Sequence, residues 1–315
     1  MAGGSRAPLR LGLALSGPTD ADAWRKTIAL AAWADRHGFE SIWLPEGHLR
    51  PGATSAPLVA LAAIAARTER VRIGTTSLLL SIHDPARVAL EVAALDQLSN
   101  GRVILGVGRG FDPAMFQAFG VDPKEKRDRF DEALDAMLAA WRAAAAAPDA
   151  APARPVQDPH PPIWVAAFGP KGLAQAARRG LPYLASPIET FGALVENYAR
   201  HAALLPADVD RAALAVPVMR TVHIAESDAE ARRIAEASEA EFAAIASRAR
   251  GAIAARAAGS AADRVIIGTA SAVADRIAAY REQVVIDHLI VRPPSRIGDD
   301  ARIRSLEALT QLVAS

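Results

Sequence analysis

Short apolar segments alternate with longer amphipathic segments along the whole chain, and this alternation constrains the fold most. The apolar segments, among them Val71–Leu80, Val103–Val107 and Ile163–Ala167, do not alternate apolar with polar residues. This pattern is typical of strands that are buried on both faces of a parallel sheet and separated by helices. Eight such units predict a (β/α)8 TIM barrel that forms one domain over residues 1–315. A doubly wound open sheet is the competing arrangement.

The expected elements cover nearly the whole chain. The expected strands are Leu9–Leu15, Ser41–Leu44, Val71–Leu80, Val103–Val107, Ile163–Ala167, Tyr183–Ala185, Val216–Ala225 and His288–Arg292. The expected helices are residues 23–37, 58–67, 85–98, 124–147, 171–179, 191–204, 228–258, 271–283 and 299–313. Residues 143–155, rich in Ala and Pro, have few large apolar side chains and are expected to form a surface loop.

Composition excludes several classes of protein. The 315 residues are 51% hydrophobic, which permits a sizeable core, and 36 basic against 35 acidic residues leave a net charge of +1. This balance gives no reason to expect nucleic-acid or membrane partners. The chain has 0 cysteines, which rules out disulfides and thiolate metal sites. No apolar run approaches the ~20 residues that span a bilayer, so we expect a soluble, cytoplasmic protein.

Residues that follow barrel strands converge on one face, so their chemistry indicates the function. They include no cluster of metal ligands and no Gly-Xaa-Ser-Xaa-Gly motif. Gly106–Gly110 (GVGRG) contains three glycines, which allow a ligand to approach the backbone, and Arg109, which suits a phosphate. The alternative is a glycine-rich strand end with a solvated arginine. The spacing does not match a Rossmann fingerprint.

A second turn suited to anions, Phe168–Gly172 (FGPKG), lies between an expected strand and helix. Its free N–H groups, the helix dipole and Lys171 favour a bound anion, although an ordinary turn would use the same glycines and proline. His48 follows an earlier strand and is a candidate for proton transfer, with a structural role as the alternative. Glu46 precedes it and is a similar candidate for chemistry, although its carboxylate could equally pair with Arg50.

The chain resembles the luciferase-like monooxygenases, flavin-dependent enzymes related to bacterial luciferase. The tightest similarity is Val71–Gly110, with its Arg-Ile-Gly-Thr strand, His-Xaa-Pro turn, Leu-Asp-Xaa-Leu-Ser-Xaa-Gly-Arg link and Gly-Val-Gly-Arg-Gly end. Weaker matches are residues 38–43, 163–172 and 267–269. The resemblance therefore extends over nearly the whole chain.

This resemblance implies a barrel that binds a reduced flavin at its C-terminal mouth. It implies that Arg109, the amide of Phe111 and the turn Phe168, Gly169, Lys171 and Gly172 hold the phosphate. It places Ser186 beside the flavin, and Thr76 and Ser77 at a non-proline cis peptide against the ring.

One position departs from bacterial luciferase. That enzyme has Glu-His-His where this chain has Glu46-Gly47-His48, so the first histidine, implicated in catalysis there, is absent. His48 is the nearest candidate for a catalytic residue, and we do not expect light emission.

The resemblance implies a monooxygenase or oxidoreductase that uses reduced FMN and oxygen on an unidentified small organic substrate. The alternative cofactor is coenzyme F420, because residues 166–171 are similar to the turn of several F420 enzymes, which transfer hydride. A separate flavin reductase is expected to supply reduced FMN, and the family implies a homodimer. Two other functions stay open: a phosphate-binding barrel lyase or isomerase, and a non-catalytic flavin-binding relative.

Overall fold

We obtained a computed structural model that describes residues 8–49, 53–147, 154–167, 169–248 and 260–314. Its contacts divide the chain into two compact units, which we describe separately. The N-terminal unit comprises residues 14–36 and 40–166, and the C-terminal unit comprises residues 1–13, 37–39 and 167–315. The expectation of a single domain stays a prediction.

The N-terminal unit is built on parallel strands in the order β2-β3-β5-β6. They are β2 (Ser41–Leu44), β3 (Arg72–Thr75), β5 (Val103–Gly108) and β6 (Ile163–Ala166), and the short β4 (Leu78–Leu79) also pairs with β5. All of β2 and β5 is buried, which explains why their sequences are continuously apolar.

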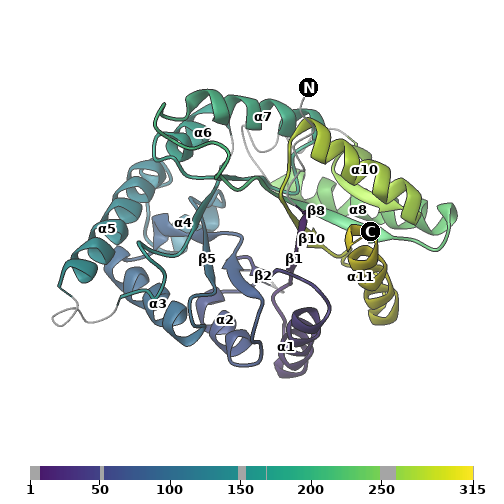
Figure 1. The fold of residues 1–315 in the computed structure, drawn as a ribbon, viewed down its shortest axis with the longest axis horizontal. Coiled ribbons are helices and arrows are strands. Elements are labelled where there is room, and N and C mark those ends of the chain that lie inside the picture. The colour runs from purple at the N-terminus through teal and green to yellow at the C-terminus, as the bar shows by residue number, and fades with distance from the viewer. Residues whose placement is uncertain (1–7, 50–52, 148–153, 168, 249–259, 315) are drawn as a thin grey trace. The chain divides into compact units, whose positions relative to one another are not determined.

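Helices cover this sheet in the N-terminal unit. They are α1 (Ala21–Arg36), α2 (Pro57–Ala65), α3 (Pro85–Leu98), α4 (Pro113–Ala118) and α5 (Lys126–Ala146), with a 3-10 turn, η1 (Leu80–Ile82), between β4 and α3. Helix α2 packs against α3, and α3 packs against α5, so the helices form one layer on the outer side of β5 (Figure 1). Asp84 caps α3 by accepting a hydrogen bond from the Arg87 amide.

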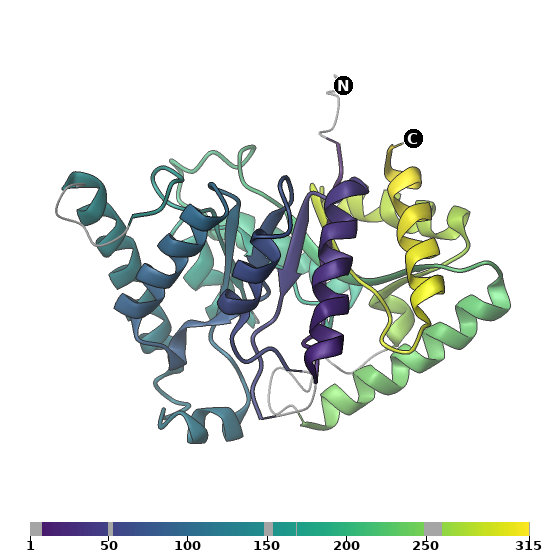
Figure 2. The same ribbon diagram turned by 90° about the horizontal axis from the view of Figure 1, so that it is seen from below.

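The C-terminal unit has parallel strands in the order β1-β10-β8-β9. They are β1 (Arg10–Ala14), β10 (His288–Arg292), β8 (Pro217–Ile224) and β9 (Val265–Gly268). A bridge between Ala185 and Val218 places β7 (Tyr183–Leu184) beside β8. Its helical elements are α6 (Gly169–Ala177), α7 (Phe191–Leu204), α8 (Asp228–Arg248), the 3-10 turn η2 (Ala261–Asp263), α10 (Ala270–Gln283) and α11 (Asp299–Ala314). Figure 2 shows α8 in green and α11 in yellow.

The predicted α/β class with parallel strands is confirmed, whereas barrel closure stays a prediction. The expected strand Val71–Leu80 is divided into β3, β4 and η1, and its Thr76–Ser77 peptide is cis. Among the described residues, three elements were not predicted: α4, β9 and the 3-10 turn η2. Helix α5 extends to Ala146, into the expected loop 143–155, of which residues 148–153 lie outside the described part of the chain. The last part of the expected helix 228–258 also lies outside it.

Among the described residues, no helix combines the length and the apolar character needed to cross a membrane.

Candidate active site

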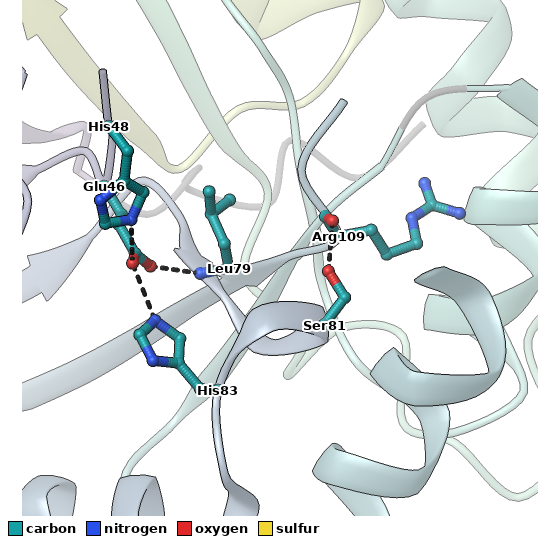
Figure 3. Close-up of polar contacts among 6 residues, drawn as sticks. All are labelled: Glu46, His48, Leu79, Ser81, His83 and Arg109. Carbon is teal, nitrogen blue, oxygen red and sulfur yellow. Dashed lines mark hydrogen bonds and ion pairs between the residues drawn. The ribbon is translucent and has the colours of Figure 1, made fainter. Parts of the chain in front are cut away.

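The carboxyl ends of the strands in the N-terminal unit bring Glu46, His48 and His83 together. Glu46 and His48 follow β2, and His83 follows η1. Since parallel strands end at the same edge of a sheet, residues 37 positions apart can meet there. Figure 3 shows both imidazoles directed at the Glu46 carboxylate.

The Glu46 carboxylate is fully buried and accepts three hydrogen bonds. Its Oε1 lies 2.7 Å from Nε2 of His48 and 2.8 Å from Nε2 of His83. Its Oε2 accepts a hydrogen bond of 2.6 Å from the Leu79 amide, so this amide is bonded to a side chain and not to a neighbouring strand. Three donors compensate a charge that would otherwise be costly to bury. The sequence left open an ion pair between Glu46 and Arg50, but Arg50 lies outside the described residues.

These contacts shift the pKa values of Glu46 and His83 in opposite directions. Burial alone would raise the pKa of Glu46, but the hydrogen bonds and charge of His83 and the bonds from Leu79 and His48 hold it below the ordinary value. Burial alone would lower the pKa of His83, but the hydrogen bond and charge of Glu46 raise it above the ordinary value. The pair therefore favours a carboxylate and an imidazolium.

His48 lies between this carboxylate and an aromatic ring. Its side chain is 9% exposed, and the Phe119 ring stands edge-on at 4.8 Å between centroids. Because Glu46 accepts at Nε2, the proton of a neutral His48 resides there and Nδ1 is the acceptor. In the part of the chain that the structure describes, no three His, Asp or Glu side chains are arranged so that they could hold a metal ion.

Thr76 and Ser77 lie between β3 and β4, and their peptide is cis, as the resemblance implied. The Thr76 amide donates to the Leu44 carbonyl, and the Ser77 carbonyl accepts from the Glu46 amide. This segment is therefore joined by backbone hydrogen bonds to the end of β2, next to the Glu46 cluster. A flavin contact by either residue stays a prediction.

Arg109 follows β5 and shares its surroundings with Lys126 and Arg127, in the first turn of α5. Burial, and next to it the charge of Arg127, lower the pKa of Arg109 to about 10, against an opposing effect of Asp131. Burial and the charges of Arg109 and Arg127 likewise lower the pKa of Lys126. We call these three side chains the basic cluster. Figure 3 shows the Arg109 side chain directed away from Glu46.

The basic cluster lies at an unfavourable place for cations. The start of a helix carries partial positive charge, so basic residues in its first turn are destabilising unless an anion compensates them. Helix α5 begins with Lys126 and Arg127, and Asp128 supplies one negative charge there. The Lys126 ammonium also lies 5.7 Å from the centre of the Phe116 ring. This arrangement can bind an anion with more than one negative charge.

The other predicted phosphate ligands are distributed over both units. Phe111 belongs to the N-terminal unit, and the residue is 47% exposed. Gly169, Lys171 and Gly172 form the first turn of α6 in the C-terminal unit, where Lys171 is exposed. Phe168 lies outside the described residues. A shared phosphate site of these residues with Arg109 stays a prediction.

Ser186, in the C-terminal unit, is held by two buried charged residues that the sequence did not single out. The Ser186 amide donates to Glu189 at 2.9 Å, and its carbonyl accepts from Arg220 at 2.8 Å. Burial raises the pKa of Glu189, although hydrogen bonds from the Tyr183 hydroxyl, the Ser186 amide and the Asn197 side chain oppose this effect. The backbone at Ser186 is thus fixed from both sides, and its proximity to a flavin stays a prediction.

Sequence reasoning missed several members of these clusters. It included His83 only as part of the His-Xaa-Pro turn, and it did not consider Lys126, Arg127, Glu189 or Arg220. A signal was present for two of them, because basic residues at the start of an expected helix are unfavourable. Nothing in the sequence linked Glu46 to His83, since that contact depends on the path of the chain through β4 and η1.

Parallel strands with polar clusters at their carboxyl ends define the class: an α/β protein of the kind whose members generally bind ligands at the strand ends. The family model "luciferase-like monooxygenase" matches residues 1–287, and the chain belongs to that family.

Relatives of known activity and a solved structure agree with this assignment. The chain is 41% identical over 113 residues to 4-hydroxyprotoasukamycin monooxygenase of Streptomyces nodosus subsp. asukaensis, covering 36% of this chain and 30% of the relative. It is 27% identical over 233 residues to the oxygenase component of a flavin-dependent trigonelline monooxygenase of Acinetobacter baylyi, covering 68% and 63%. The monooxygenase RslO1 from Streptomyces bottropensis has a TM-score of 0.79 at 26% identity, covering 97% and 99%. The chain spans about half the length of the first curated relatives it matches, 48% and 54%.

Proposed function

We propose that the protein is a monooxygenase or oxidoreductase that uses reduced FMN and oxygen on a small organic substrate. The basic cluster carries this proposal, because it gathers three cationic groups at one strand end and one helix start. Membership of the luciferase-like monooxygenases and the flavin dependence of the trigonelline enzyme support it.

The basic cluster fits the phosphate of FMN. Burial and the charge of Arg127 lower the pKa of Arg109, and burial and the charges of Arg109 and Arg127 lower the pKa of Lys126. A phosphate monoester carries about two negative charges near pH 7, so the three cationic groups would attract it. The start of α5 would add N–H groups and the helix dipole to this interaction.

The roles of the remaining residues follow from where they lie. Bound reduced FMN would supply the electrons for reaction with oxygen. The basic cluster would orient it, and Ser186 would contact it where Glu189 and Arg220 fix the backbone. His48 would hold or move a proton at the substrate through Nδ1, while Glu46 fixes its orientation.

The wider organisation is also a proposal. We propose a closed (β/α)8 barrel. Two observations support it: β7 lies beside β8, and the structural similarity to RslO1 covers 97% of the chain. We propose that a separate reductase supplies reduced FMN, because the trigonelline relative is the oxygenase component of its enzyme. A homodimer is expected from the family resemblance, and we also propose a cytoplasmic location.

Anaerobic titration with reduced FMN and with reduced coenzyme F420 tests the choice of cofactor. We expect reduced FMN to bind more tightly, and we expect the complex to consume oxygen when air is admitted. Tighter binding of reduced F420 would replace the oxygen reaction by hydride transfer. Binding of neither cofactor would contradict the proposed function and favour a phosphate-binding lyase or isomerase. Tight binding of reduced FMN without oxidation of any substrate tried would favour the non-catalytic relative.

A further inference from the structure

The cluster of Glu46, His48 and His83 contains more than a single proton-transfer residue requires. We propose that His83 is a positioning residue for His48: it carries the positive charge that buried Glu46 needs, and so keeps His48 neutral with a free Nδ1. The chemical use of this state rests on the proposed function, whereas the state itself does not.

The first step concerns the tautomers of the two imidazoles. Oε1 of Glu46 lies within hydrogen-bond distance of Nε2 of both His48 and His83. A carboxylate oxygen only accepts, so each Nε2 must carry a hydrogen. Each neutral imidazole would then hold its lone pair at Nδ1. The carboxylate thereby fixes the tautomer of both rings.

The second step concerns charge. The Glu46 side chain is 0% exposed, and a buried carboxylate requires a nearby positive charge as well as hydrogen bonds. One imidazolium is sufficient for this purpose. Two imidazolium ions on one oxygen would repel each other and leave an excess positive charge in a buried site. The two histidines therefore compete for one charge.

The third step decides which histidine holds that charge. The His83 side chain is 29% exposed and the His48 side chain 9%, so a charged ring loses less hydration at position 83. The raised pKa of His83 agrees with this assignment. His48 instead has the Phe119 ring against it, which does not hydrate a charge.

Other charged groups around the cluster leave this assignment in place. From α3, Glu91 raises the pKa of His83, and Glu91 itself bonds to Arg87 at 2.8 Å. From α5, Arg129 donates to the Ser81 carbonyl at 2.8 Å, so its charge is directed at the backbone of η1. Glu91 therefore adds to the attraction that Glu46 exerts on a proton at His83.

The consequence is a base that is available near neutral pH. In the part of the chain that the structure describes, no residue forms a hydrogen bond with Nδ1 of His48. While His83 carries the charge that compensates Glu46, Nδ1 of His48 can accept a proton from the substrate. If His83 could not be charged, His48 would take the proton that compensates Glu46, and Nδ1 would no longer be a base.

Nitrogen-15 NMR of the full chain, labelled at histidine and free of cofactor, tests this assignment. The shifts of the ring nitrogens report which of them carries a proton. Between pH 6 and 8 we expect His48 to be neutral with its proton on Nε2, and His83 to be charged at the lower end of this range. A charged His48 beside a neutral His83, or a proton on Nδ1 of neutral His48, would overturn the proposal without any substitution.

The variant His83→Gln separates charge from hydrogen bonding. Glutamine can still donate one hydrogen bond to Glu46 but cannot become charged. We expect His48 to take up its second proton about one pH unit higher in this variant, the lower end of the effect of a neighbouring charge. If His83 served only to hold the structure, the conservative variant would leave the His48 signals unchanged, which would overturn the proposal. His37→Gln, at an exposed histidine outside the cluster, is the matched control.

The turnover of substrate gives an independent result. With His83→Gln we expect the acidic limb of the pH–kcat profile to move upward by the same unit, with the affinity for reduced FMN unchanged. A lower affinity for FMN without any shift of the profile would contradict the positioning role. Failure of FMN to bind the wild-type protein would refute the proposed function and leave the NMR result to decide the charge of His83.

Discussion

Gly108 leaves the space that Ser77 occupies. A Cβ at position 108 would lie 2.2 Å from Oγ and 3.1 Å from Cβ of Ser77. Gly108 ends β5 and pairs with Leu79 of β4, so the absence of a side chain lets the segment after β3 approach the end of β5. The glycine-rich motif therefore has a packing role besides any contact with a ligand.

We predict that Gly108→Ala destabilises the protein by about 1–3 kcal/mol, the usual cost of overpacking a buried site. The Cβ would force Ser77 to move, and the Ser77 carbonyl accepts from the Glu46 amide. Urea unfolding measures the change. Gly192→Ala is the control, because a Cβ there meets nothing within 4 Å in α7, and it should be neutral or stabilising. Equal stability of both variants would contradict the close approach.

A second prediction concerns the phosphate. Arg109→Ala should weaken the binding of reduced FMN by roughly 10- to 150-fold, the equivalent of a charge-assisted hydrogen bond of about 1.5–3 kcal/mol. Reduced riboflavin lacks the phosphate, so its affinity should change little. Anaerobic fluorescence titration of both ligands measures this difference.

The control for Arg109→Ala is Arg142→Ala, an exposed arginine near the end of α5. It should affect neither ligand. An equal loss of FMN and riboflavin affinity in Arg109→Ala would place the phosphate elsewhere and assign Arg109 to the ring or to folding.

The elements of the fold were predictable where one physical signal dominated. Strands Ser41–Leu44 and His288–Arg292 were predicted with the bounds observed, because they are short apolar runs between helices. Helix α4 was missed although Asp112 and Pro113 form a normal helix start. Six residues are too few to show an apolar periodicity.

In the described residues, the Leu-Asp-Xaa-Leu-Ser-Xaa-Gly-Arg link, part of the most specific sequence similarity, has a largely structural role. Asp96 is fully buried and accepts from the amides of Val156 and Gln157 and from the Gln157 side chain. Arg102 donates to carbonyls of Ala65, Thr68 and Val71. These contacts lie near the start of β5, away from the strand end that carries Arg109. A motif can thus identify a family through residues that stabilise its fold.

We therefore predict that Asp96→Asn lowers the free energy of unfolding by about 2–4 kcal/mol. The asparagine NH₂ group would replace one of the two carboxylate oxygens, and it would face N–H donors that need an acceptor. The affinity of the folded variant for reduced FMN should stay within twofold of wild type. Thermal unfolding and an anaerobic titration below the melting temperature measure the two quantities. Glu132→Gln, on the exposed side of α5, is the control and should alter neither. Loss of affinity without loss of stability would indicate a role in the site.

The last prediction is a window of pH in which the pair of Glu46 and His83 stabilises the fold. The pKa of His83 is raised above 6.5, so its contribution is complete below about pH 6.5 and is lost as the pH rises through the raised value. The pKa of Glu46 is lowered below 4.5, so its contribution is complete above about pH 4.5 and is lost as the pH falls through the lowered value.

Both charges are therefore present between about pH 4.5 and 6.5. In this range the unfolding free energy of His83→Gln should be about 1 kcal/mol lower than that of wild type. This is the value expected for an ion pair whose burial is intermediate between fully exposed and fully buried pairs. Urea unfolding of both proteins from pH 4 to 9 measures the difference, which should shrink toward both ends. If the difference in unfolding free energy between wild type and His83→Gln grew with pH, neutral His83 would make the stronger contact. A contact that depends on the charge of His83 must weaken when the ring loses its proton.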